Sequence, residues 1–278
     1  MTRLLAAVAL LLVALTACSG GDEPSADRSP SAPSSAPSSP APTPTRATAP
    51  ARPADRACYR LSFDVALAPT NGSTPVDCAK THTSMTFAVG ALDTVVDGHL
   101  LAVDSQHVQA QVATACPAAL PRFLGGTPDA LHLSMFRAVW FTPTVEESDA
   151  GANWYRCDVI AIAHQGALAP LTGKLAGVLA DPQTADQYGM CGTAEPGTAG
   201  FSRVICSGDH SWRALRTVPF TDSRYPGETT VRDAGQEPCK DAGRDAASDK
   251  LSFKWGYEWP TEKQWAAGQH YGLCWAPD

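Results

Sequence analysis

Two histidines at matched distances from cysteines are the residues of this sequence best suited to chemistry. His82 follows Cys78 by four positions within a Val-x-Cys-x-x-x-His pattern, and His210 follows Cys206 in the same way. Imidazole titrates near neutral pH and binds metals, so the two residues could form a paired metal site or supply a general base. The alternative is a structural histidine whose ring bonds to nearby backbone beside a disulfide. A zinc site would need reduced thiols, and the cysteine count favours disulfides, so we predict no metal or cofactor.

Catalytic motifs do not accompany the two histidines. Asp209, His210 and Ser211 are the residue types of a triad, but neighbours on a strand point to opposite faces and cannot form a relay. Gly-x-Ser-x-Gly, His-Glu-x-x-His and phosphate-loop patterns are absent from the sequence. We therefore assign no catalytic residue and predict that the chain is not an enzyme.

Aromatic residues gather near the end of the chain and form the second candidate site. Trp255, Tyr257 and Trp259 alternate along an expected strand from Leu251 to Trp259, and Trp265 follows. Exposed aromatic rings stack on sugars or anchor a partner protein, whereas buried rings fill a core. We take Trp255, Trp259 and Trp265, with His82 and His210, as candidate binding residues.

The sequence contains nine cysteines, and the first differs in context from the others. Arg3 and the apolar run Leu4 to Val13 precede Leu-Thr-Ala-Cys18, which resembles a bacterial lipobox, so we expect a signal peptide over residues 1–18 and a lipid on Cys18. Eight cysteines remain, and an even number in an exported chain implies disulfides. They are Cys58, Cys78, Cys116, Cys157, Cys191, Cys206, Cys239 and Cys274.

Residues 19–57 form an expected disordered linker, because nine prolines among Ser, Ala and Thr cannot bury enough apolar surface to fold. The formal net charge of −7 argues against nucleic acid as a partner. Apart from the signal, no apolar run is long enough for a transmembrane helix. The expected location is the outer face of the cytoplasmic membrane, with the lipid as anchor.

An internal repeat organises residues 58–278. We define repeat one as residues 58–157, a connector as 158–190 and repeat two as 191–278, each repeat with four cysteines. Four cysteines allow three pairings, and we favour Cys58–Cys78, Cys116–Cys157, Cys191–Cys206 and Cys239–Cys274. A match over 22 residues has no gap: Phe136, Trp140, Pro143, Thr144, Gly151 and Cys157 recur as Phe253, Tyr257, Pro260, Thr261, Gly268 and Cys274.

Hydrophobic periodicity predicts the same element order in both repeats, namely strand, helix, strand, strand. Strands are expected over 76–92, 131–140, 155–163, 201–218 and 251–259. A helix begins after Asp104 or Ser105 and should kink or end at Pro117, and a short helix is expected over 172–179. The class is α+β with antiparallel sheets, disulfide-stapled, with the repeats related by a pseudo-twofold axis.

These motifs resemble the septum-formation domain of actinobacterial envelope lipoproteins. The resemblance rests on the two Cys-x-x-x-His patterns, on Pro260-Thr261-Glu-Lys-Gln-Trp-Ala-Ala-Gly268 before Cys274, and on Pro170-Leu-Thr-Gly-Lys-Leu-Ala-Gly177 in the connector. Repeat one departs from the pattern, with Glu147 and Ser148 in place of Gln-Trp. The resemblance implies a role in septum formation, cell division or wall processes. We expect a non-enzymatic binding or scaffold module for a division protein or wall glycan; the alternative is a metal-dependent or histidine-based hydrolase of envelope material.

Overall fold

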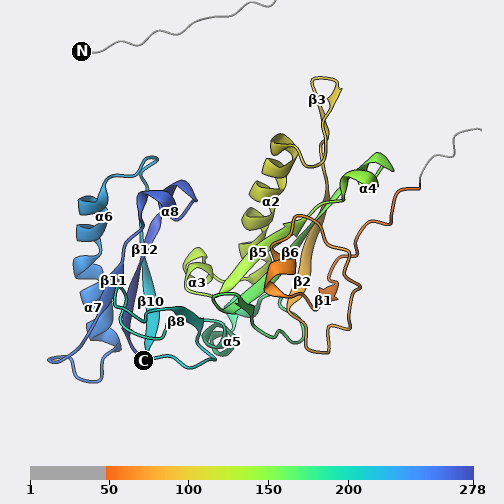
Figure 1. The fold of residues 1–278 in the computed structure, drawn as a ribbon. Coiled ribbons are helices and arrows are strands. Elements are labelled where there is room, and N and C mark those ends of the chain that lie inside the picture. The colour runs from red at the N-terminus through yellow and green to blue at the C-terminus, as the bar shows by residue number, and fades with distance from the viewer. Residues whose placement is uncertain (1–47) are drawn as a thin grey trace, which may run out of the picture. The chain divides into compact units, whose positions relative to one another are not determined.

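The computed structural model describes residues 48–278, which belong to a unit running from Thr45 to Asp278 (Figure 1). The expected signal segment, Cys18 and the linker up to residue 47 lie outside the described residues. Residues 48–57, the end of the expected linker, contain no helix or strand. None of the helices within 48–278 has the length and apolar character needed to cross a bilayer.

The described chain is of the α+β class, and its principal sheets are antiparallel, as predicted. One five-stranded sheet has the order β1-β2-β6-β5, with β7 paired to β6, and the other has the order β11-β12-β10-β8-β9. A short hairpin of β3 and β4 stands apart from both sheets within these residues and projects at the end of the molecule near α2 (Figure 1).

Repeat one and the connector supply the first sheet and its helices. The long helix α2 packs on β5, β6 and β2 (Figure 1). The elements are β1 (Cys58–Tyr59), α1 (Phe63–Ala66), β2 (Ser84–Ala91), β3 (Val95–Val96), β4 (His99–Leu100), α2 (Gln106–Leu124), α3 (Pro128–His132), β5 (Phe136–Phe141), α4 (Val145–Asp149), β6 (Trp154–His164), β7 (Ala167–Leu168), the 3-10 turn η1 (Val178–Ala180) and α5 (Pro182–Gln187).

Repeat two, together with Met190 just before it, supplies the second sheet. Helix α7 packs on β12, β10 and β11 in the same way that α2 packs on the first sheet. The elements are β8 (Met190–Gly192), β9 (Arg203–Ile205), β10 (Trp212–Pro219), α6 (Glu228–Ala234), α7 (Gln236–Ala246), β11 (Gly256–Glu258), α8 (Glu262–Ala266) and β12 (Tyr271–Pro277).

The two sheets share strand order and register. The order β1-β2-β6-β5 corresponds to β8-β10-β12-β11. An irregularity between Thr86 and Ala88 of β2 has its counterpart between Ala214 and Arg216 of β10. Both α4 and α8 begin with a capping box, at Thr144 and Thr261, in which the threonine hydroxyl and a Glu or Gln side chain bond reciprocally to backbone N–H groups.

Four disulfides join the pairs favoured by the sequence: Cys58–Cys78, Cys116–Cys157, Cys191–Cys206 and Cys239–Cys274. Each disulfide joins one cysteine to the next cysteine in the sequence. Cys116–Cys157 ties α2 to β6, and Cys239–Cys274 ties α7 to β12. Because all four of these sulfur-bearing residues are buried, the disulfides form part of the helix–sheet packing.

One hydrophobic core contains residues from both repeats. Val108 and Phe136 of repeat one belong to the same buried cluster as Trp212 and Trp275 of repeat two. The backbone N–H of Met135 donates to the carbonyl oxygen of Tyr188 at 2.8 Å, which links β5 to the connector. Burial of apolar surface at about 25 cal/mol per Å² makes this shared core a principal source of stability.

Helix α2 does not end at Pro117, one of the two outcomes predicted there, because it continues through Pro117 and Pro121 to Leu124. Each proline removes one backbone N–H, which ordinarily costs about 3 kcal/mol inside a helix. Tertiary packing offsets that cost, since Cys116, Leu120 and Leu124 are all buried against the sheet. Helix propensity alone could not predict that the helix continues past both prolines.

Several predicted strands are too long. Residues 76–83 are irregular before β2, residues 206–211 form a turn between β9 and β10, and the strand expected over 251–259 is reduced to Gly256–Glu258. Leu251 is 97% exposed, so the alternating pattern there does not mark a buried face. The helix expected over 172–179 is absent, and only the 3-10 turn Val178–Ala180 forms. Gly173 and Gly177 adopt positive φ at 69° and 79°, which interrupts a helix.

Candidate functional site

His82 is fully buried just before β2. Its ring Nδ1 lies 2.9 Å from the carbonyl oxygen of Lys80, and Nε2 has no hydrogen-bond partner in the described chain. Because a carbonyl only accepts, Nδ1 carries the proton and Nε2 keeps a lone pair in the neutral ring. This is the structural arrangement that the sequence favoured, with the ring bonded to nearby backbone.

The connector covers this histidine. The backbone of His82 pairs with Leu171 through N–H···O bonds of 3.0 and 2.8 Å, and Gly173 donates to the carbonyl of Cys78 at 3.1 Å. Residues 170–177 of the connector therefore pack against the first Cys-x-x-x-His segment. No route from solvent to the ring is visible, since His82 has 0% exposure.

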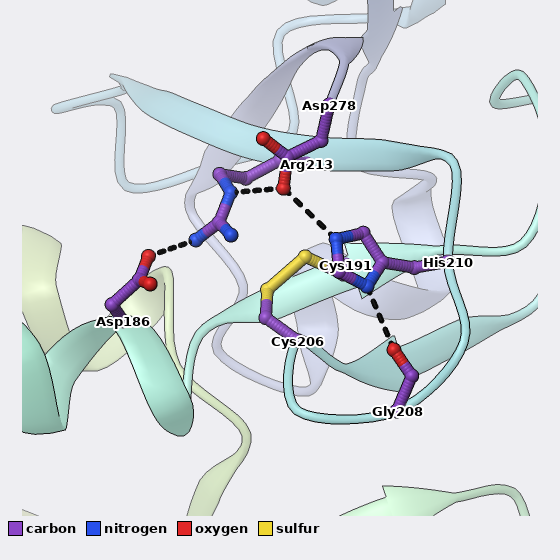
Figure 2. Close-up of a disulfide and its surroundings, with 7 residues drawn as sticks. All are labelled: Asp186, Cys191, Cys206, Gly208, His210, Arg213 and Asp278. Carbon is purple, nitrogen blue, oxygen red and sulfur yellow. Dashed lines mark hydrogen bonds and ion pairs between the residues drawn. A yellow bond between two sulfur atoms is a disulfide. The ribbon is translucent and has the colours of Figure 1, made fainter.

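His210 occupies the matched sequence position but has different surroundings, shown in Figure 2. Its Nδ1 lies 2.8 Å from the carbonyl oxygen of Gly208, and its Nε2 lies 2.9 Å from Oδ2 of Asp278. Arg213 donates from Nε to the same carboxylate oxygen at 2.6 Å and forms a second ion pair with Asp186 of α5. The network connects β10 to β12 and to the connector helix.

The partners of His210 fix its protonation. Both are acceptors, so both ring nitrogens donate only when the ring is an imidazolium. The hydrogen bond to the Gly208 carbonyl, followed by the bond to Asp278, raises the pKa of His210. Burial alone would raise the pKa of Asp278, but the bonds from His210 and Arg213 outweigh it, and the pKa is lowered. Both shifts favour the charged forms, so the contacts stabilise an imidazolium–carboxylate pair.

A metal does not fit this arrangement. One ligand atom each from Cys191, His210 and Asp278 lies within 4.8 Å of the others, a spacing compatible with an ion. Cys191, however, is joined to Cys206 in a disulfide and offers no thiolate (Figure 2). Both nitrogens of His210 already face hydrogen-bond acceptors, the Gly208 carbonyl and the Asp278 carboxylate, so neither faces an open coordination position.

A triad does not fit either. The Ser211 hydroxyl donates to the carbonyl oxygen of Thr193 at 2.9 Å, and no hydrogen bond joins it to His210 among the residues described. Both His210 nitrogens are already engaged, so neither can accept a proton from a nucleophile. His82 and His210 share no hydrogen-bond partner among the residues described, so the alternative of one paired histidine site has no support in these contacts.

The aromatic candidates divide into buried and partly exposed rings. Trp265 is 4% exposed and stacks on His270 with ring centroids 4.5 Å apart, so its ring is a packing element of the α8 region. Trp255 and Trp259 are partly exposed and pack at the edge of a cluster that contains Tyr257. These two rings have the free surface that a binding face requires.

A buried charged network on β6, the strand that runs from repeat one into the connector, was missed by sequence reasoning. Asp158 is fully buried on β6 and accepts hydrogen bonds of 2.8 Å from the hydroxyls of Ser84 and Thr86. The Nε atom of Arg156 lies 3.1 Å from Asp158 Oδ1, close enough for an ion pair but not aligned as a hydrogen bond. Burial raises the pKa of Asp158, and the Arg156 charge and these bonds act against that shift.

The guanidinium of Arg156 lies over the Tyr59 ring at 4.0 Å and the Phe141 ring at 4.5 Å. The sequence did contain a signal for this pair. Arg156 and Asp158 are two positions apart in an otherwise apolar strand, so their side chains share one face of β6. Repeat two has Leu273 and Trp275 at the corresponding positions of β12, both buried in the shared core. The polar network is therefore specific to repeat one.

The fold and these contacts define a disulfide-stapled α+β module built from two similar sheets. The family model described as septum formation matches residues 57–274, and the chain belongs to that family. No curated protein and no solved structure matches the chain.

Proposed function

We propose that this protein is an exported lipoprotein, anchored through Cys18 on the outer face of the cytoplasmic membrane, whose folded module binds a partner during septum formation or wall synthesis without catalysing a reaction. Family membership supports the link to septum formation. Four disulfides fit an oxidising compartment, and the lipobox-like Leu-Thr-Ala-Cys18 fits lipid attachment. The linker would hold the module away from the membrane.

The observation that carries the non-enzymatic role is the state of the two histidines. His82 is sealed from solvent, and both nitrogens of His210 are committed to acceptors. Neither ring is free to act as a base or a metal ligand. The hydrolase alternative therefore has no supporting contact within residues 48–278.

The proposed partner is a division protein or wall glycan that contacts Trp255 and Trp259. Partly exposed indole rings stack on sugar rings and anchor protein interfaces. We further propose that the two repeats are related by a pseudo-twofold axis, which the equal strand order and the shared position of the sheet irregularity support.

A test combines location and capture in intact cells. A photo-reactive residue at Trp259 should cross-link a division protein or wall fragment, and a matched substitution at exposed Leu251 should not. A fluorescent fusion should concentrate at septa. Uniform distribution together with cross-links equal to those of the Leu251 control would contradict the proposal.

A further inference from the structure

A small pocket between the repeats combines apolar walls with one uncompensated positive charge. Its volume is about 220 Å³. Helix α2, helix α3 and strand β5 of repeat one form most of it, and β12 of repeat two closes it. The apolar lining residues are Pro117, Leu120, Leu131, Phe136 and Ala138. Polar groups come from His132, Arg137 and Tyr271.

The guanidinium of Arg137 is held in place from one side. Its Nη1 donates to the carbonyl oxygens of Ser134 and Phe136 at 2.9 and 2.6 Å. Within residues 48–278, Nε and Nη2 have no hydrogen-bond partner, and no carboxylate lies within 4.0 Å of the group. The Nε and Nη2 hydrogens lie on one edge of the planar guanidinium and form a fork that matches the two oxygens of a carboxylate.

Two stacked aromatic rings form another part of the lining, and neither is an anion. The rings of His132 and Tyr271 stack with centroids 3.9 Å apart and an interplanar angle of 12°. Burial lowers the pKa of His132, so this ring is neutral near pH 7. Arg203 also lies close enough to act on both Arg137 and Tyr271, but its charge is paired with Glu258 at 3.2 Å. Asp129, the acidic neighbour of His132, accepts a hydrogen bond of 2.6 Å from the Thr217 hydroxyl.

The geometry points to a binding site for a carboxylate carried on a short aliphatic group, such as the free carboxyl end of a peptide whose last residue is aliphatic. The Arg137 fork would hold the carboxylate, and the apolar walls would hold the side chain. The volume lies below the range of about 300–1,000 Å³ for drug-sized ligands, which suits one terminal residue rather than an extended ligand. The inference rests on the proposed binding role and specifies one chemistry for it.

Binding of N-acetyl-leucine tests the inference, with N-acetyl-leucinamide as the uncharged match. The full chain in neutral detergent, with ¹³C-labelled histidine, reports through the His132 ring signal. We expect the acid to bind at least tenfold more tightly than the amide and to shift that signal. Arg137→Gln should remove the preference for the acid, while Arg224→Gln, at an exposed arginine outside the pocket, should keep it. Equal affinity of the wild type for acid and amide would overturn the inference without any variant.

Two further arms complete the design. Arg137→Lys keeps the charge but loses the fork, so it should weaken the preference even if Arg137→Gln fails to fold. A leucine-terminated tripeptide and 4-methylpentanoate carry the same carboxylate and aliphatic group, and only the tripeptide adds a peptide backbone. Tighter binding of the tripeptide would identify a peptide end as the ligand, and equal or weaker binding would identify a free small acid. A chain that concentrates at septa yet shows no acid preference refutes the pocket alone. A chain that binds the acid but is absent from septa refutes the proposed function instead.

Discussion

The ring Nε2 of His210 and the carboxylate of Asp278 lie 2.9 Å apart, although 68 positions separate the two residues in sequence. The bond joins the segment before β10 to the end of β12, and Arg213 shares the same carboxylate. His82, at the matched position of repeat one, has no such partner. One sequence pattern thus produces a fully buried ring in one repeat and a surface ring paired with a carboxylate in the other.

The charged pair makes stability depend on pH. Because the pKa of His210 is raised from 6.5, its contribution is fully present below that value and is lost as pH rises through the raised pKa. Because the pKa of Asp278 is lowered from 3.8, its contribution is present above that value and is lost as pH falls through the lowered pKa. His210→Gln should therefore destabilise the protein by about 0.5–1 kcal/mol between these two values.

Thermal unfolding from pH 4 to 9 measures this effect. The deficit of His210→Gln should shrink once the pH passes the raised pKa of His210. His99→Gln, at an exposed position of β4, serves as the control and should follow the wild type throughout. A deficit that stays constant up to pH 9 would show that the ring acts without its charge.

Substitution of His82 separates its hydrogen bond from its bulk. Asn can place a donor near the position of Nδ1 and keep the bond to the Lys80 carbonyl, whereas Leu cannot. His82→Leu should lose about 1–3 kcal/mol of unfolding free energy through the unpaired carbonyl, and His82→Asn should lose less. Urea titration gives both values. Equal losses would mean that the ring contributes only through packing.

The buried ion pair of repeat one should respond strongly to loss of one partner. Asp158→Leu leaves Arg156 charged and buried, and we expect a cost of about 3–5 kcal/mol. The double variant Arg156→Leu/Asp158→Leu removes both charges and leaves apolar side chains, as at the matched positions Leu273 and Trp275 of repeat two. It should be more stable than the single variant. Denaturant unfolding decides this order; a double variant less stable than the single one would contradict it.

Removal of disulfides should scale with the loop that each one closes. Cys116–Cys157 spans 41 positions and Cys191–Cys206 spans 15. In the chain-entropy account each contributes about 3–4 kcal/mol, and the longer loop contributes about 1 kcal/mol more. Paired Cys→Ala variants measured under non-reducing conditions provide the comparison. Peptide mapping of the wild type should find all eight cysteines of the folded part oxidised.

Membrane attachment tests the anchor independently of the fold. Cys18→Ala should move the protein out of the membrane fraction or leave it unprocessed, because several acyl chains hold a bilayer where a bare chain does not. Mass spectrometry of the wild-type amino-terminal peptide should detect the lipid. A processed Cys18→Ala protein that stays with the membrane, beside an unmodified wild type, would disprove the anchor.

Sequence patterns predicted the elements that local signals specify and failed where distant contacts decide. The strand over 155–163 corresponds closely to β6 (Trp154–His164), because most of its residues are apolar and turns bound it. The two threonines that cap α4 and α8 also lie at matched positions. By contrast, α2 continues past Pro117 because Leu120 and Leu124 are buried against a sheet. Local sequence patterns do not show such a tertiary contact. The partner of His210 could not be predicted for the same reason, because Asp278 lies 68 positions away in the sequence.

The order of the disulfides has a consequence for how the chain matures. Each native bond joins a cysteine to the next one along the folded part, from Cys58–Cys78 to Cys239–Cys274. If the cysteines of the exported chain emerge in sequence order, an oxidase that couples every newly emerged thiol to the free one before it would produce the native set directly. Such a protein would need an oxidant during secretion but no isomerase to reshuffle mispaired bonds.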